Sequence, residues 1–106
     1  MTMAAKPHNM KVSVVIPVYN GAKTIGSLVQ ALEKELANRF DLEVVLVNDG
    51  SPADNSAEVC MDIARGDPKV KFIDLSCNFG EHNAVMAGFN YCAGDAAVVI
   101  DDDYGR

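Results

Sequence analysis

Three consecutive aspartates, Asp101, Asp102 and Asp103, directly follow the apolar segment 96–100. Such a segment is typical of a buried strand, which would deliver the carboxylates to one edge of a sheet. In an extended chain Asp101 and Asp103 point to the same side, whereas Asp102 points away. The outer pair could therefore share one Mg²⁺ or Mn²⁺ ion, because hard cations prefer oxygen ligands. The alternative is three solvated acids, since exposed charge is common.

Three further polar clusters also follow apolar segments. They are residues 17–20 (PVYN), 48–51 (NDGS) and 76–81 (SCNFGE). The carboxylate of Asp49 could accept hydrogen bonds from an N–H group of uracil or guanine, and Tyr19 could stack on the base. Asp49 could equally be a turn or helix-capping residue, and Tyr19 a side chain packed beside a sheet edge.

Strand-like and helix-like patterns alternate along the chain. The strand-like segments are rich in Val and Ile, and the helix-like segments carry apolar residues three, four and seven apart. Strands are predicted over residues 11–17, 42–47, 70–75 and 96–100, and helices over residues 23–38, 54–65 and 81–92. Pro17 is expected to stop the first strand, and Thr24 and Gly66 to cap helices. Met86 and Phe89 are expected in the core because of their helical spacing.

Continuously apolar strands separated by amphipathic helices predict a parallel sheet with helices on both faces. The fold class is therefore α/β, a Rossmann-like three-layer sandwich. Right-handed crossovers point the carboxyl ends of all strands to one edge, and ligands bind there where the strand order reverses. Every polar cluster of the chain is expected at this edge.

Composition narrows the class of protein further. The 106 residues make one domain, and 49% hydrophobic against 23% charged residues is the balance of a soluble globular protein. A net charge of −6 gives little support to nucleic-acid binding. Residues 1–10 are expected to be disordered and contain no signal peptide or membrane span, so we place the chain in the cytoplasm. The three cysteines, Cys60, Cys77 and Cys92, are expected to be reduced and mostly buried.

Four segments in order, VSVVIPVYN, VVLVNDGS, LSCNFGEHNAVMAG and VVIDDD, resemble the nucleotide-binding half of the family 2 glycosyltransferases, which have the GT-A fold. The resemblance runs from Lys11 to Asp103 and is strongest to the dolichol-phosphate mannose synthase-like and undecaprenyl-phosphate sugar transferase branch. It implies that Asp101 and Asp103 form an Asp-X-Asp motif whose divalent cation bridges the donor diphosphate. The nucleotide-binding residues that it implies are Pro17, Tyr19, Asn20, Asp49, Asn78, Gly80 and Asp101.

The resemblance implies the nucleotide-diphospho-sugar-binding part of an inverting, metal-dependent glycosyltransferase. Its donor would be UDP- or GDP-linked, and its acceptor a polyprenyl phosphate or a saccharide. Residues 11–106 would form a truncated domain, because the family's acceptor-side acid follows the Asp-X-Asp motif. No catalytic residue is assigned, and transfer by this chain alone is not expected.

Several residues keep a second interpretation or depart from the family pattern. Gly80 could serve a plain turn, and His82 and Asn83 could either line the diphosphate side or form the polar start of a helix. Gly21 stands where many relatives carry an acid, and residues 104–106 (YGR) replace the usual continuation, which suggests a truncated, frame-shifted or deliberately cut product. Two alternative functions are a non-catalytic remnant and a receiver-like, magnesium-binding regulatory domain.

Overall fold

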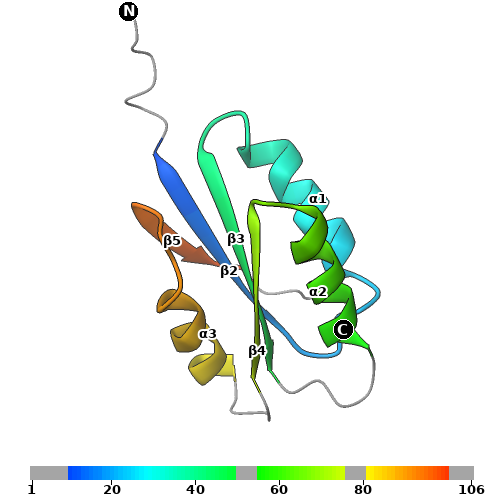
Figure 1. Ribbon diagram of the computed structural model, residues 1–106. Helices are drawn as coiled ribbons and strands as arrows, with labels where there is room; N and C mark the ends of the chain where they lie inside the picture. The colour runs from blue at the N-terminus through cyan, green and yellow to red at the C-terminus, as the bar shows by residue number, and fades with distance from the viewer. Residues whose placement is uncertain (1–9, 50–54, 76–80, 101–106) are drawn as a thin grey trace, which may run out of the picture.

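The computed structural model describes residues 10–49, 55–75 and 81–100, without the side chains of residues 49 and 81–83. Strands and helices alternate throughout this part of the chain (Figure 1). The elements are β2 (Lys11–Val18), α1 (Ile25–Leu36), β3 (Asp41–Asp49), α2 (Ser56–Gly66), β4 (Val70–Leu75), α3 (Glu81–Phe89) and β5 (Ala96–Val99). The predicted order of elements is confirmed.

The four strands form one parallel sheet in the order β4-β3-β2-β5. The chain moves outward from β2 to β3 and β4, then returns across the sheet to place β5 on the free side of β2. The strand order therefore reverses between β2 and β5. This arrangement confirms the α/β class and the Rossmann-like topology, in which ligands bind beyond the carboxyl ends at such a reversal.

Helices cover both faces of the sheet. Helices α1 and α2 pack on one face, against the even-numbered residues of the central strands such as Val14 and Leu46. Helix α3 packs on the other face, where Ala84 contacts the cluster of Val15, Val45 and Val47. Because β2 and β3 are covered on both sides, their runs of Val, Ile and Leu are continuous rather than alternating.

Helix α3 approaches the sheet through small residues rather than through its large apolar ones. A Cβ atom on Gly88 would lie 2.5 Å from Cγ1 of Val15, so the helix axis can sit close to β2 only because this residue is glycine. The core positions predicted for Met86 and Phe89 are wrong, since these residues are 50% and 38% exposed. The helical spacing of Met86 and Phe89 is typical of a buried face, but the face of α3 that packs on the sheet carries Ala84 and Gly88.

Strand β5 is the least covered strand. All four of its residues are exposed, including Val98 and Val99 at 44% and 40%. The expectation that this strand is buried is wrong, because β5 lies at the edge of the sheet and α3 packs mainly over β2 and β3. Its apolar composition alone does not reveal its position in the sheet.

Several predicted boundaries also differ. Strand β2 continues through Pro17 to Val18, and α3 ends at Phe89 rather than at residue 92. Gly66 lies inside α2, so it does not cap that helix, and Thr24 makes no capping hydrogen bond with its side chain. The Thr24 hydroxyl instead donates to the carbonyl of Gly21.

Candidate functional site

The carboxyl ends of the strands meet at one edge of the sheet, as predicted. Val18, near the end of β2, pairs with Asn48 of β3, so Tyr19 follows beside Asp49. On the other side of β2, Val99 of β5 pairs with Val15. The structure thus brings the ends of β2 and β3 together and places β5, which leads to the aspartate triplet, on the opposite side of β2.

Pro17 lies within β2 and does not end that strand. The carbonyl of Lys11 accepts a hydrogen bond from the N–H of Asp95, and the carbonyl of Val15 accepts one from the N–H of Ile100. The odd-numbered residues of β2 therefore direct their backbone groups toward β5. Pro17 faces the same way but has no N–H to donate. A missing N–H at Pro17 costs nothing on the side of β3, and pairing with β3 continues through Pro17 to Val18. This corrects the prediction that proline stops the strand.

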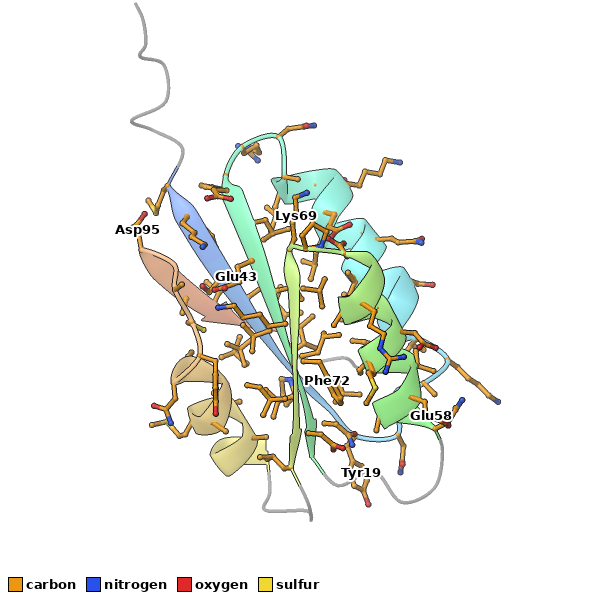
Figure 2. All side chains as sticks on the ribbon, viewed as in Figure 1. Tyr19, Glu43, Glu58, Lys69, Phe72 and Asp95 are labelled. Carbon is orange, nitrogen blue, oxygen red and sulfur yellow. The ribbon has the colours of Figure 1, made fainter. Side chains whose placement is uncertain are left out.

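Tyr19 and Asn20 form the bend that leaves the sheet at this edge. The Tyr19 side chain extends outward at the carboxyl end of the sheet, opposite in position to Asp95 at the amino end of β5, and the residue is 48% exposed (Figure 2). Asn20 adopts φ = 56°, a left-handed conformation that asparagine tolerates better than most residues. The bend therefore presents a tyrosine ring surface to solvent at the strand end.

Asn48, the first residue of the predicted polar cluster 48–51, is buried near the end of β3. It is 3% exposed, and its side-chain amide donates to Oδ1 of Asp74 on β4 at 3.0 Å. This bond ties the ends of β3 and β4 together just before Asp49. The backbone of Asp49 belongs to β3, but its side chain lies outside the described part of the structure.

The remaining predicted site residues, Asn78, Gly80, Asp101 and Asp103, lie outside the described residues. The side chains of His82 and Asn83 do so as well. Within residues 10–49, 55–75 and 81–100, no group of three or more His, Cys, Asp or Glu side chains could hold a metal ion. In the same ranges no helix is long and apolar enough to span a membrane.

Two of the three cysteines that were predicted to be reduced and mostly buried lie within the described residues. Cys60 is a buried thiol, and Cys92 is a partly buried one whose Sγ lies 3.4 Å from the carbonyl oxygen of Gly88. Burial raises the pKa of the Cys92 thiol, which keeps it protonated at neutral pH. Cys77 lies outside the described residues.

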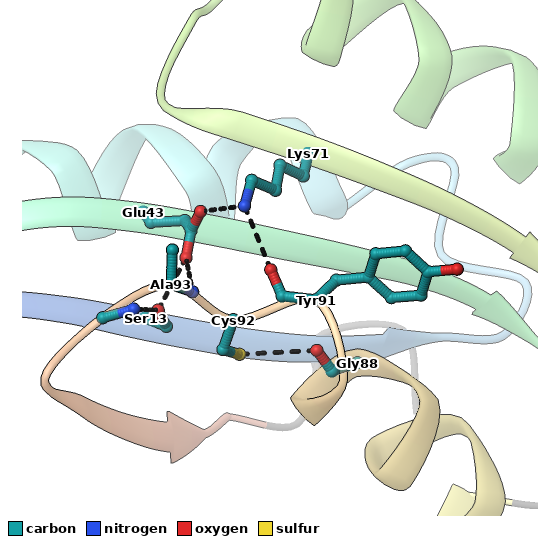
Figure 3. A network of polar contacts seen from close by, with 8 residues as sticks. Ser13, Glu43, Lys71, Gly88, Tyr91, Cys92 and Ala93 are labelled. Atoms are coloured by element: carbon teal, nitrogen blue, oxygen red, sulfur yellow. Dashed lines mark hydrogen bonds and ion pairs between the residues drawn. The ribbon is translucent and has the colours of Figure 1, made fainter.

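A second polar cluster lies in the amino-terminal half of the sheet, on the face covered by α3 (Figure 3). The Ser13 hydroxyl donates to Oε1 of Glu43 at 2.7 Å, and the other oxygen of Glu43 forms an ion pair with Lys71. The expectation that every polar cluster lies at the carboxyl edge is therefore wrong. Ser13 and Glu43 are polar residues within otherwise apolar strands, and the two residues pair with each other across β2 and β3. Their presence in apolar segments was the sequence signal that could have predicted this cluster.

This cluster holds the turn between α3 and β5. The backbone N–H of Ala93 donates to Oε1 of Glu43 at 2.9 Å, and that of Gly94 donates to the Ser13 hydroxyl at 2.9 Å. Lys71 Nζ donates to the carbonyl of Tyr91 at 3.0 Å. Three strands thus anchor one turn through hydrogen bonds.

The Glu43 carboxylate is stabilised in its charged form despite its burial. Burial by itself raises the pKa, but the hydrogen bonds from Ala93, Lys71 and Ser13 and the charge of Lys71 outweigh it and lower the pKa to about 2. The Glu43 side chain is 6% exposed, so solvent screens these interactions little. Protonation of Glu43 is therefore unfavourable in the folded protein.

We expect this shift to make the fold sensitive to acid. The folded-state pKa of Glu43 lies below its usual value of 4.5, so the stabilisation is complete above pH 4.5 and is lost as the pH falls toward 2. The shift corresponds to about 3 kcal/mol of unfolding free energy. Urea unfolding at several pH values between 6 and 2 measures it. Glu43→Gln should flatten this pH dependence, and the exposed Glu35→Gln should not; equal curves for the two variants would contradict the assignment.

The amino-acid sequence of the chain is similar to those of known glycosyltransferases. The model of the family described as Glycosyl transferase family 2 matches residues 13–104. An undecaprenyl-phosphate 4-deoxy-4-formamido-L-arabinose transferase from Pseudomonas fluorescens is 43% identical over 96 residues, which are 87% of this chain and 27% of the relative. The corresponding transferase from Proteus mirabilis is 42% identical over 95 residues, which are 88% of this chain and 29% of the relative. The chain thus spans little more than a quarter of these relatives.

Solved structures share the fold. A mannosyltransferase from Pyrobaculum calidifontis in complex with GDP-Man and Mn²⁺ superposes with a TM-score of 0.79 at 23% identity, over 92% of this chain and 28% of that one. TarS from S. aureus in complex with UDP gives a TM-score of 0.74 at 28% identity, over 89% of this chain and 28% of that one. Both superpositions agree with the parallel sheet and the strand reversal described above. With the family match over residues 13–104, they lead to one conclusion: the chain belongs to glycosyl transferase family 2.

Proposed function

We propose that this chain is the nucleotide-diphospho-sugar-binding part of an inverting, metal-dependent glycosyltransferase. The observation that supports this most is the strand reversal between β2 and β5, since β5 leads in the sequence directly to the aspartate triplet. In open parallel sheets this is the position at which nucleotides bind. In receiver domains the first strand lies between the second and the third. Here the first of the four strands, β2, lies between the second, β3, and the fourth, β5. The sheet therefore does not fit the receiver-like alternative.

The metal end of the proposed site is the aspartate triplet. Asp101 and Asp103 would hold Mg²⁺ or Mn²⁺, and carboxylate oxygens are the donors that these hard cations prefer. A bound cation would neutralise charge on the donor diphosphate as it leaves. The relative whose structure contains GDP-Man and Mn²⁺ supports a divalent ion in this fold.

The base end of the proposed site lies on the other side of β2. Tyr19 is exposed at the strand end beside Asp49, in the position expected for a side chain that stacks on a base. Asp49 would accept a hydrogen bond from a base N–H. Asn20, with φ = 56°, shapes the bend in which Tyr19 lies. Pro17 lies between the base end and the metal end, whereas Asn78 and Gly80 would let the backbone approach the diphosphate.

The acceptor is proposed from the relatives. Two transferases named for undecaprenyl phosphate match this chain, so we propose a polyprenyl phosphate acceptor for the intact protein, with a saccharide as the alternative. A phosphate acceptor is already anionic, and its attack needs no strong general base. The reaction would take place at the cytoplasmic face of the membrane, where nucleotide sugars are available. The domain proposed for this role comprises residues 11–106.

The test is calorimetric titration of UDP and GDP into the 106-residue chain, with Mn²⁺ or Mg²⁺ present and then with EDTA. We expect binding that depends on the metal. Asp103→Asn should weaken it more than about 100-fold, because it removes a charged ligand, while Asp102→Asn should leave it nearly unchanged. Binding by neither nucleotide, or equal losses in both variants, would contradict the proposal.

The same titration addresses the second candidate, a non-catalytic remnant. The apolar strand β5 favours this candidate, since it is exposed at the edge of the sheet formed by the described strands and such edges promote association. A remnant would bind no nucleotide and would elute as large species in size-exclusion chromatography. A monomer that melts cooperatively and binds a nucleoside diphosphate would exclude it.

A further inference from the structure

The turn that leads into β5 is anchored at the amino end of the sheet, far along the strand from the proposed site. Glu43 accepts from the N–H of Ala93, and Ser13 accepts from that of Gly94. Asp95 adds a second anchor, since its N–H donates to the carbonyl of Lys11 at 2.7 Å and its carboxylate accepts from the Lys11 N–H at 3.0 Å. The first residues of β5 are therefore fixed before the strand begins.

Few other contacts determine the register of β5. Among the described residues it pairs with β2 alone, over four residue pairs from Val12↔Ala96 to Val15↔Val99. All four of its residues are exposed, and the apolar contact with the core at this end of the strand is made by the partly buried Ile100 that follows it. Register is weakly specified in strands of this kind unless a neighbouring turn specifies it. Here the anchored turn is the feature that can do so.

Space at the anchor also requires one particular register. A Cβ atom on Gly94 would lie 2.8 Å from the backbone nitrogen of Ser13 and 2.9 Å from the carbonyl oxygen of Lys11. Only a glycine can approach β2 this closely, so a shift by one residue would place Ala93 or Asp95 where neither fits. Glu43 then recognises the correct turn through the N–H of Ala93.

We propose that Glu43 is a positioning residue for the metal-dependent diphosphate site, acting by holding the α3–β5 turn and thereby the register of β5 on β2. The inference rests on the proposed function, because its consequence is the placement of Asp101 and Asp103. Asp101 is joined directly to Ile100, whose N–H donates to the carbonyl of Val15 at 3.0 Å. Because Asp101 follows Ile100 directly in the chain, a change in the register of β5 would shift the point on β2 from which the aspartate triplet continues.

Two measurements on the 106-residue chain test this inference. The first is amide hydrogen exchange at Ile100, which needs no ligand. The second is the affinity for UDP or GDP with Mn²⁺ and with EDTA. Glu43→Gln should accelerate exchange at Ile100 at least about 10-fold and weaken Mn²⁺-dependent binding about 10-fold, as expected for loss of support outside the ligand set. Binding in EDTA should not change.

Ser13→Ala is the second variant, and Val29→Ala is the matched control. Ser13→Ala removes the acceptor of the Gly94 N–H while keeping the Glu43–Lys71 ion pair, and it should reproduce both effects if Glu43→Gln does not fold. Val29 is 3% exposed and lies on the opposite face, under α1. Its truncation lowers stability without touching the turn, so neither local exchange at Ile100 nor Mn²⁺-dependent binding should change under native conditions.

Two results would overturn the inference. The first is an unchanged Ile100 exchange rate or an unchanged Mn²⁺-dependent affinity in both cluster variants. The second is an equal loss of affinity in Val29→Ala, which would show general destabilisation. Absence of metal-dependent binding by the unsubstituted chain would overturn the proposed function, and with it the binding role of Glu43, even where exchange at Ile100 confirmed its hold on β5.

Discussion

Gly94→Ala is expected to lower the free energy of unfolding by about 3 kcal/mol or more. The added methyl group would lie 2.6 Å from the Ser13 hydroxyl oxygen and within 3 Å of backbone atoms of Ser13 and Lys11. Backbone of a central strand cannot move aside as a flexible side chain can. The displaced turn would also lose the hydrogen bond from the Gly94 N–H to the Ser13 hydroxyl. Because Ser13 is fully buried, water cannot replace this bond.

Thermal unfolding followed by circular dichroism measures this effect, with a fall in Tm of more than about 10 °C expected. Gly26→Ala is the matched control, because a Cβ there meets nothing within 4 Å and the residue lies in α1. Alanine at that position should stabilise the helix by about 0.5 kcal/mol. A Gly94→Ala variant as stable as the unsubstituted chain would mean that the α3–β5 turn is not packed against β2 as described.

Leu46→Ala should cost about 3 kcal/mol, within the range of 2–5 that is usual for buried leucines. Leu46 is fully buried in β3, among the residues that α1 and α2 cover. Its truncation leaves a cavity between the central strand and two helices, and the close-packed sheet can collapse into it only in part. Chemical denaturation at pH 7 gives the difference in free energy of unfolding.

Met86→Ala provides the comparison for this second variant. Met86 is 50% exposed on α3, so its truncation should change the free energy of unfolding by at most about 1 kcal/mol. The hydrophobic pattern of the sequence alone predicts that Leu46 and Met86 are both core residues. Equal losses in the two variants would indicate that α3 packs on the sheet through Met86 and not through Ala84 and Gly88.

Much of the fold could be predicted from local patterns. The continuous Val-rich segments of β2 and β3 predicted strands buried on both faces, and these are the strands between two helical layers. The failures concern residues whose burial depends on their neighbours. Val98 looks like Val14 in sequence, yet it is exposed because β5 lies at the edge. Met86 fits a buried helical face, yet a glycine occupies that face.

The candidate site was predictable to a similar degree. Pro17, Tyr19 and Asn20 do lie at the carboxyl edge, beside the end of β3. Their grouping follows from the parallel topology alone, since all strands point the same way. The buried cluster of Ser13, Glu43 and Lys71 was missed, because a lone polar residue in a strand gains its meaning only from the partners that pairing brings to it.

The amino-acid sequence by itself determined the alternation of strands and helices, the α/β class, the polar residues that end the strands and the membership in glycosyl transferase family 2. These are properties of local periodicity, turn chemistry and motif order. Only the tertiary structure decided that β2 continues through Pro17, that β5 is exposed and that Glu43 holds the turn before it. Each of these depends on contacts between residues distant in the chain, and such contacts exist only once the sheet has formed.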